Sequence, residues 1–277
     1  MADLTHTTFS AEVQAAGAGL DPVRANLLFA REIAYPDLRP EESWLQLDDL
    51  AVAAQRTLRA ADPATRAQAL AHFLSERAGF RGDRETYSDP RNSYINDVLE
   101  RRLGLPISLA VLYVHLARRC GLAAEGVGLP GHFIVGVATG AGRLLLDPFN
   151  GGAVLSEADC QRLVAQTAGH SGPLDPRWLA PTPGREIVAR MLNNLRGSYT
   201  ALEAWPHAIR VVERLRELQP DQPGHLRDLG LLHYKTGAHL QAAEILGHYL
   251  TLAPDAADAD EIRRSRQLLR DEGARWN

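Results

Sequence analysis

Three residues of the sequence have the types that a hydrolase or acyl-transfer enzyme combines in one site. A hydroxyl nucleophile needs a neighbouring base, and that base needs a third group to orient it. Ser108 is a candidate nucleophile, His132 a candidate base and Asp147 a candidate orienting group. Each also has a simpler interpretation. A serine in the first turn of a helix commonly bonds a free backbone group, and a His–Asp pair can stabilise a fold without catalysing a reaction.

His132 and Asp147 lie on two predicted strands. Residues 132–137 alternate between faces, and 143–147 are apolar up to the aspartate. Between them, 139–142 has the Gly-rich composition of a hairpin turn. A turn centred on the first two of these residues would place His132 directly opposite Asp147, with Cβ atoms about 5 Å apart. A longer loop would leave the two residues diagonal to each other.

Hydrophobic spacing predicts the elements that position these residues. The first hundred residues have helical spacing, and the helix that follows is apolar over nearly its whole circumference, which is typical of a buried helix. The predicted helices span 23–35, 45–58, 63–74, 92–102, 106–119 and, after the strands, 156–166 with Ser156 as N-cap. Helices followed by antiparallel strands indicate an α+β domain.

The C-terminal third is predicted to be all-helical and repetitive. The string Leu-Gln-Pro at 218–220 recurs as Leu-Ala-Pro at 252–254, which is 34 residues later. A 34-residue period with Pro at the end of each helical hairpin is typical of tetratricopeptide repeats. Two such hairpins are too few to stack stably alone, so we expect them to pack on the preceding domain. The predicted division is 1–183 for the helices and core, and 184–277 for the repeats.

Longer strings between residues 92 and 152 resemble one bacterial family. They are Asn-Ser-Tyr at 92–94, Leu-Glu-Arg-Arg-Leu-Gly-Leu-Pro-Ile-Ser-Leu at 99–109, Gly-Leu-Pro-Gly-His-Phe at 128–133 and Leu-Asp-Pro-Phe-Asn-Gly-Gly at 146–152. In this order they resemble the SirB1 (UPF0162) family, and the resemblance extends over nearly the whole chain. It implies a transglutaminase-like core, made of a buried helix and an antiparallel sheet, followed by tetratricopeptide-type hairpins. Members have been associated with regulatory roles, and a eukaryotic F-box protein carries a similar domain.

The resemblance also implies that a catalytic thiolate would lie at the start of the buried helix, where the helix dipole lowers its pKa. This sequence has Pro106 at that position. Cys120 is at the other end of the same helix, about 20 Å away, and Cys160 lies beyond the strands. We interpret both cysteines as small buried hydrophobic side chains. We therefore expect a non-catalytic, transglutaminase-like pseudoenzyme that acts as an adaptor or regulator. The alternative is a hydrolase or acyl-transfer enzyme that uses Ser108 with the His–Asp pair.

Three further residues are candidates for binding. Asn92 either lines the same cleft or caps the helix predicted to begin there. Gly131 and Asn150 lie in strings whose glycines indicate tight turns around the His–Asp pair, which could shape a pocket. Zinc spacing, a phosphate-binding loop and a dinucleotide fingerprint are missing from the sequence, so we expect no metal and no cofactor. We expect a protein or peptide partner bound by the repeat helices.

Charge and hydropathy exclude two classes of partner. The formal net charge is −4 without a cluster of basic residues, so we expect no nucleic-acid binding. An apolar run of the ~18 residues needed to span a bilayer is missing, and the first residues lack the pattern of a secretory signal. We therefore expect no membrane association and a cytoplasmic location.

Overall fold

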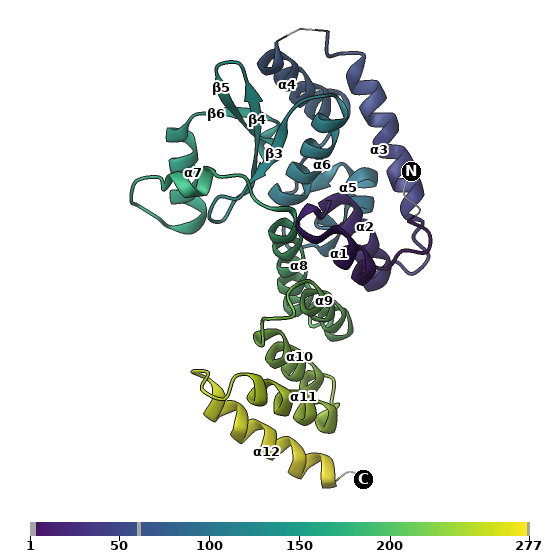
Figure 1. Cartoon of the computed structure of the whole chain (residues 1–277), viewed down its shortest axis with the longest axis vertical. Coiled ribbons are helices and arrows are strands. Elements are labelled where there is room, and N and C mark those ends of the chain that lie inside the picture. The colour runs from purple at the N-terminus through teal and green to yellow at the C-terminus, as the bar shows by residue number, and fades with distance from the viewer. Residues whose placement is uncertain (1–3, 60–61, 276–277) are drawn as a thin grey trace.

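The computed structural model describes residues 4–59 and 62–275, which form a lobe and a stack of helices that extends from it (Figure 1). The helices of the lobe are α1 (Phe9–Ala16), α2 (Pro22–Ile33), α3 (Pro40–Gln55), α4 (Pro63–His72), α5 (Ile95–Arg101), α6 (Pro106–Arg119) and α7 (Glu157–Ala168). The stack consists of α8 (Gly184–Ala201), α9 (Trp205–Leu218), α10 (Gly224–Lys235), α11 (His239–Leu252) and α12 (Ala259–Arg275). In the described ranges, no helix is long and apolar enough to cross a membrane.

A four-stranded antiparallel sheet forms one side of the lobe. Its strands are β3 (Ala124–Val127), β4 (Ile134–Thr139), β5 (Gly142–Asp147) and β6 (Ala153–Leu155), in that spatial order. A second, two-stranded parallel sheet joins β1 (Arg81–Gly82) to β2 (Leu103–Gly104). The fold is thus α+β, as predicted. The sequence did not predict β1, β2 and β6, which have two or three residues each and are too short for a period-two pattern.

The two faces of the sheet have different neighbours. Phe133, Val135 and Val137 point into the main core, which also contains the buried helix α6. On the other face, Ile134 and Leu145 pack in a second cluster under α7, together with the side chains of Cys160 and Val164. Both faces are therefore covered, and the ends of β4 and β5 are held between two packed layers.

Four helices of the lobe begin with a side chain that accepts a hydrogen bond from the first turn. Thr8 caps α1, Asp21 caps α2, Asp62 caps α4 and Ser156 caps α7. At α7 the cap is reciprocal, because Ser156 Oγ accepts from the Asp159 N–H and the carboxylate accepts from the Ser156 N–H. The predicted N-cap at Ser156 is confirmed.

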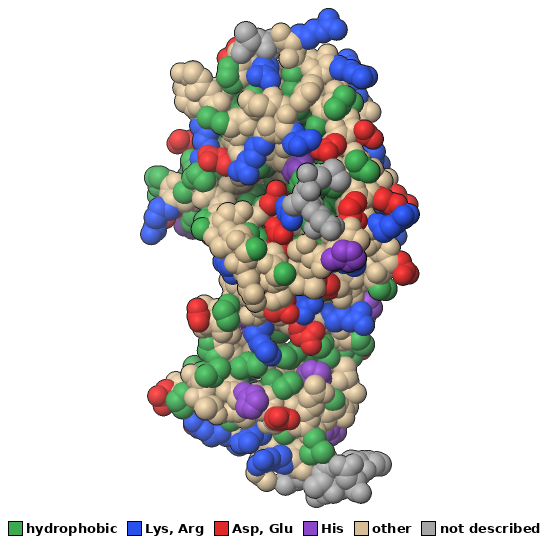
Figure 2. All heavy atoms as spheres, turned by 45° about the vertical axis from the view of Figure 1, so that its right-hand side comes forward, with side chains coloured by type: hydrophobic (Ala, Val, Ile, Leu, Met, Phe, Trp, Pro, Cys, Tyr) green, Lys and Arg blue, Asp and Glu red, His purple; other side chains and the backbone are tan. Residues whose placement is uncertain are grey.

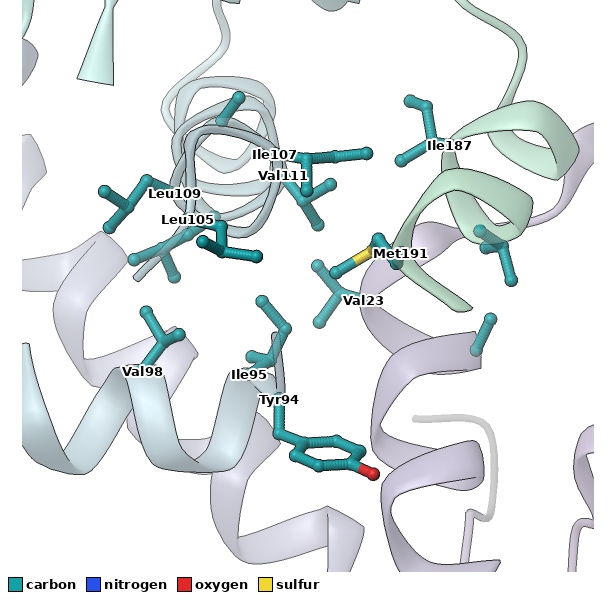
Figure 3. Close-up of a cluster of buried hydrophobic side chains, with 14 of the residues drawn as sticks. Val23, Tyr94, Ile95, Val98, Leu105, Ile107, Leu109, Val111, Ile187 and Met191 are labelled. Atoms are coloured by element: carbon teal, nitrogen blue, oxygen red, sulfur yellow. The ribbon is translucent and has the colours of Figure 1, made fainter. Parts of the chain in front are cut away.

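The first two helices of the stack, α8 and α9, make buried and polar contacts with the lobe. Ile187 and Met191 of α8 point toward Val23 of α2 and Val111 of α6 within one buried cluster (Figure 3). The ion pair between Arg214 of α9 and Glu32 of α2, with an N–O distance of 2.6 Å, adds a polar contact. Figure 2 shows that hydrophobic side chains form a band over the repeat helices, whereas charges of both signs are scattered over the lobe.

The expected packing on the domain is therefore observed for the first hairpin, α8 and α9. Because α8 shares the core of the lobe, the predicted boundary between residues 183 and 184 stays a prediction.

Candidate functional site

His132 and Asp147 meet at the end of the β4–β5 hairpin. Asp147 is the last residue of β5, and His132 lies two residues before β4 begins. His132 Nε2 is 3.0 Å from Asp147 Oδ2, and both side chains are buried. We refer to them as the His–Asp pair.

The predicted register of this hairpin is wrong, because the partner of each β5 residue lies two residues later on β4 than we predicted. Thr139 pairs with Gly142 and Val135 with Leu146, so the turn is centred one residue later than we expected. In this register Ile134, and not His132, is at the height of Asp147. His132 therefore reaches the carboxylate diagonally. The loop keeps two residues, so this placement results from a displaced turn and not from the longer loop that the alternative assumed.

The Asp147 carboxylate is held by four donors. Oδ2 accepts from His132 and from Asn150 Nδ2, at 2.6 Å, while Oδ1 accepts from the backbone N–H groups of Phe149 and Asn150, at 3.1 and 3.3 Å. Burial by itself raises the pKa of Asp147, but the hydrogen bonds and the charge of His132 outweigh it and leave the pKa below its ordinary value. An ionised Asp147 requires a proton on Nε2 of His132. The lone pair of a neutral His132 is therefore on Nδ1.

A ring of polar and aromatic side chains covers the pair. The Phe149 ring stands at 90° to the imidazole of His132 with 6.0 Å between centroids, and Tyr87 packs against the same Phe149 at 6.0 Å. Arg84 lies over Phe149 and donates to Asn150 Oδ1. The loop that carries Arg84 and Tyr87 thus packs on Phe149 and Asn150 beside the pair, and only 6% of His132 is exposed. Sequence patterns carry no signal for Arg84 or Tyr87, because the two residues are distant in sequence and lie in an unpatterned loop.

Asn92 holds this loop and does not cap a helix. Its Nδ2 donates to the Thr86 carbonyl at 2.7 Å, and its Oδ1 accepts from Arg101 at 3.0 Å. The helix predicted from Asn92 begins instead at Ile95, whose N–H donates to Asn26 Oδ1 at 2.8 Å. The capping interpretation is therefore wrong, because a buried asparagine from α2 satisfies the start of α5.

Ser108 lies in the first turn of α6 and is fully buried. Its Oγ donates to the Asn92 carbonyl at 2.6 Å, with the Leu105 carbonyl at 3.1 Å, and accepts from the Leu105 N–H at 2.9 Å. Gly104 makes room for this hydroxyl, since a Cβ there would be 2.8 Å from Oγ. The hydroxyl proton of Ser108 is thus used by the backbone. The structure joins His132, Asp147 and Asn150 in one group, and Ser108 with Asn92 in another.

Gly131 meets two separate requirements of the turn before His132. Its φ is +71°, where residues with a side chain are strained. A Cβ would also lie 2.8 Å from Thr167 Cβ and 2.9 Å from the Thr167 carbonyl carbon. Gly131 therefore lets this turn approach α7 closely.

Neither cysteine provides a reactive thiolate. Cys120 and Cys160 are both free and buried. Burial raises the pKa of Cys120, and burial together with neighbouring carboxylates raises the pKa of Cys160 to about 11. Among the residues that the structure describes, no three His, Cys, Asp or Glu side chains are grouped as metal ligands.

Comparison with known proteins places these residues in a known domain arrangement. Residues 41–193 match the transglutaminase-like superfamily, and residues 195–267 match the tetratricopeptide repeat. A UPF0162 protein of Xylella fastidiosa is 41% identical over 199 residues, which are 70% of this chain and 70% of the relative. A UPF0162 protein of Vibrio cholerae is 29% identical over 75% of this chain and 77% of its own length. The human F-box only protein 21 is 28% identical over 67% of this chain but only 32% of its own length. No solved structure matches the chain.

Proposed function

The chain belongs to the UPF0162 family, with a transglutaminase-like domain followed by tetratricopeptide repeats, and from this premise we propose that it is a non-catalytic adaptor or regulator that binds a protein or peptide through its repeat helices. Both cysteines are free, which fits a reducing compartment such as the cytoplasm.

The hydrogen bonding of Ser108 carries the non-catalytic part of the proposal. Pro106 occupies the first residue of α6, where a transglutaminase would present its thiol, and it has no nucleophilic atom. Ser108 is the nearest hydroxyl along the helix, and its proton bonds the Asn92 carbonyl. A nucleophile must instead lie within hydrogen-bond reach of its base. The His–Asp pair is left with the role of fixing the hairpin end and the loop above it.

The exposed apolar side chains of the stack support the binding part. Leu231 and Tyr234 of α10 are 41% and 45% exposed, and Leu268 of α12 is 63% exposed. Leu268 follows Tyr234 by 34 residues, so the two occupy equivalent positions of successive repeat units. Equivalent positions face the same side of a solenoid. We call this surface of Leu231, Tyr234 and Leu268 the repeat face. Apolar residues on such a face are typical of protein-binding surfaces.

A capture experiment tests this surface with point variants of the full chain. The bait proteins are the wild type, a double variant Leu231→Ser/Tyr234→Ser, and a control Leu45→Ser. Leu45 is 52% exposed on α3, outside the repeats, so the control removes a similar apolar side chain elsewhere. We expect a protein that is retained by the wild type and the control and lost with the double variant. A set of captured proteins that is the same for all three baits would contradict the proposal.

The alternative function is hydrolysis or acyl transfer by Ser108 with the His–Asp pair. The 3.0 Å contact between His132 and Asp147 favours it, because it has the geometry of a base with its orienting group. A fluorophosphonate probe discriminates the two functions, since it labels an activated serine. Labelling of the wild type that disappears in Ser108→Ala would replace the adaptor proposal by the enzyme, whereas equal or absent labelling supports the adaptor.

A further inference from the structure

A cavity lies away from the His–Asp pair. It is a cleft of about 550 Å³ beside the C-terminal half of α6, and neither His132 nor Asp147 lines it. Its walls come from α6, from the connection that leads into α2, from α3 and from the segment 181–187 that leads into α8. The volume is in the range of sites that bind small organic molecules.

The inner wall of the cleft is apolar and aromatic. Trp44 of α3, Val111 of α6 and Ile187 of α8 contribute to it. Figure 3 shows Val111 and Ile187 pointing toward each other from their two helices. Such a wall fits the flat or branched apolar body of a ligand.

One of the two arginines that line the cleft has no ion pair. Glu125 pairs with Arg143 at 2.6 Å and Arg119 with Asp48 at 2.5 Å, while the Asp21 carboxylate accepts from the N–H groups of Val23 and Arg24. Arg118 donates through Nε to the Ala124 carbonyl at 2.8 Å, but it forms no ion pair with any residue that the structure describes. Its guanidinium therefore provides an uncompensated positive charge beside the apolar wall.

His115 adds a polar group without a partner. Its Nε2 is buried, and no described residue hydrogen-bonds it. The Trp44 ring stands edge-on to the imidazole, with 5.0 Å between centroids. Burial lowers the pKa of His115, with Arg119 and Arg118 acting in the same direction against Asp21 and Asp48. An unmet buried nitrogen destabilises the folded protein, and a ligand atom that hydrogen-bonds it can recover this loss.

We propose that this cleft binds a small organic carboxylate whose apolar body lies against Trp44, Val111 and Ile187 and whose carboxylate binds Arg118. The start of α8 also favours a negatively charged group in the cleft. This helix of 18 residues begins at Gly184 in the cleft wall, and no side chain caps it. The positive end of its helix dipole favours a negative charge nearby. The proposal is independent of the repeat face and of the adaptor function.

The test uses 4-phenylbutyrate as the probe and 4-phenylbutyramide as its neutral counterpart. Backbone amide shifts of the full chain are followed by NMR during titration. We expect saturable shifts grouped in residues 18–23, 111–119 and 181–187, with the amide bound about tenfold or more weakly, because a charge-assisted hydrogen bond is lost.

Two variants at neighbouring arginines provide the matched comparison. Arg118→Gln removes the uncompensated charge and is expected to weaken phenylbutyrate binding about tenfold or more. Arg119→Gln removes a charge that Asp48 already pairs, so we expect a change of at most about threefold. Both residues are exposed. Amide shifts outside the cleft that match those of the wild type are the criterion that each variant keeps the fold. The proposal is overturned by a titration without saturable shifts in these segments, by an amide that binds as tightly as the acid, or by Arg118→Gln binding like the wild type.

Discussion

The hydroxyl of Ser108 has a single proton, and the carbonyl of Asn92 accepts it. Asn92 itself has both side-chain atoms bonded, to the Thr86 carbonyl and to Arg101. The start of α6 and the loop above the His–Asp pair are therefore linked through one buried asparagine. At the residue scale, the Ser108 hydroxyl and the Asn92 side chain thus bond the start of α6 to this loop.

Replacing Ser108 by Ala is expected to lower the free energy of unfolding by about 1–3 kcal/mol, because it leaves the buried Leu105 N–H and the Asn92 carbonyl with fewer partners. Urea denaturation measures the change. Ser93→Ala is the matched control, since Ser93 is equally buried but its Oγ has no partner among the described residues. Equal losses in both variants would show that the hydrogen bonds of Ser108 do not stabilise the fold.

Replacing Asp147 by Asn tests the charge of the His–Asp pair. At pH 7 we expect a loss of about 1.5–3 kcal/mol in the free energy of unfolding, because a buried carboxylate loses charge-assisted hydrogen bonds. The pKa of Asp147 is lowered in the folded state, so its stabilisation is fully present above the ordinary value near 4 and disappears as the pH falls through the lowered pKa.

The difference between Asp147→Asn and the wild type should therefore shrink on acidification below about pH 4. Denaturation curves at several pH values measure it. Asp221→Asn changes the net charge equally at an exposed position and serves as the control. A difference that is constant down to pH 2, or that grows, is incompatible with a carboxylate stabilised by its charge.

At the scale of elements, the turn between β3 and β4 decides where His132 lies. Gly131 gives this turn its positive φ and its close approach to Thr167 of α7. The approach also allows Thr167 Oγ1 to donate to the Pro130 carbonyl at 3.0 Å. The turn, α7 and the end of β5 are thus one packed unit around the His–Asp pair.

Glycine-to-alanine variants separate the two requirements at this turn. Gly169→Ala carries only the cost of a positive φ, about 1 kcal/mol, since nothing lies within 4 Å of its added Cβ. Gly131→Ala adds a clash to a similar φ, so we expect it to destabilise the protein by at least about 1 kcal/mol more. Gly140→Ala has neither problem and should be nearly neutral. Thermal unfolding ranks the three, and a Gly131→Ala variant as stable as Gly169→Ala would contradict the packing argument.

At the scale of the whole molecule, α8 is shared between the lobe and the stack. It buries Ile187, Met191 and Leu192 against the lobe, and Arg214 of the next helix pairs with Glu32. Each large apolar side chain removed from a core costs about 2–5 kcal/mol, against a typical stability of 5–15 kcal/mol. The lobe therefore needs α8, although the predicted division at 183 and 184 assigns this helix to the repeats.

Two truncated chains test this dependence. A chain that ends at residue 222 keeps α8 and α9, and we expect it to unfold cooperatively in urea. A chain that ends at residue 183 lacks both helices, and we expect it to lose cooperative unfolding. Circular dichroism during the urea titration measures both. If the shorter chain unfolds cooperatively with a similar midpoint, the predicted boundary at 183 and 184 is a true division between folding units.

Local signals in the sequence predicted much of the fold. The all-round apolar pattern of 106–119 predicted α6 with its observed ends, and Ser156 predicted the start of α7. The 34-residue period predicted the repeats. These features depend on neighbouring residues along the chain, through helical spacing, capping and repetition, so one sequence is sufficient to recognise them.

Contacts between distant segments were decided by the tertiary structure alone. The partner of Ser108 is a carbonyl 16 residues away, and the N–H that starts α5 finds an asparagine 69 residues away. The hairpin register shifted because turn composition permits more than one centre, and only core packing of both strands selects among them. The sequence by itself therefore determined which side chains could do chemistry. Which of them meet is a matter of non-local packing, which bonds His132 to Asp147 and Ser108 to the Asn92 carbonyl.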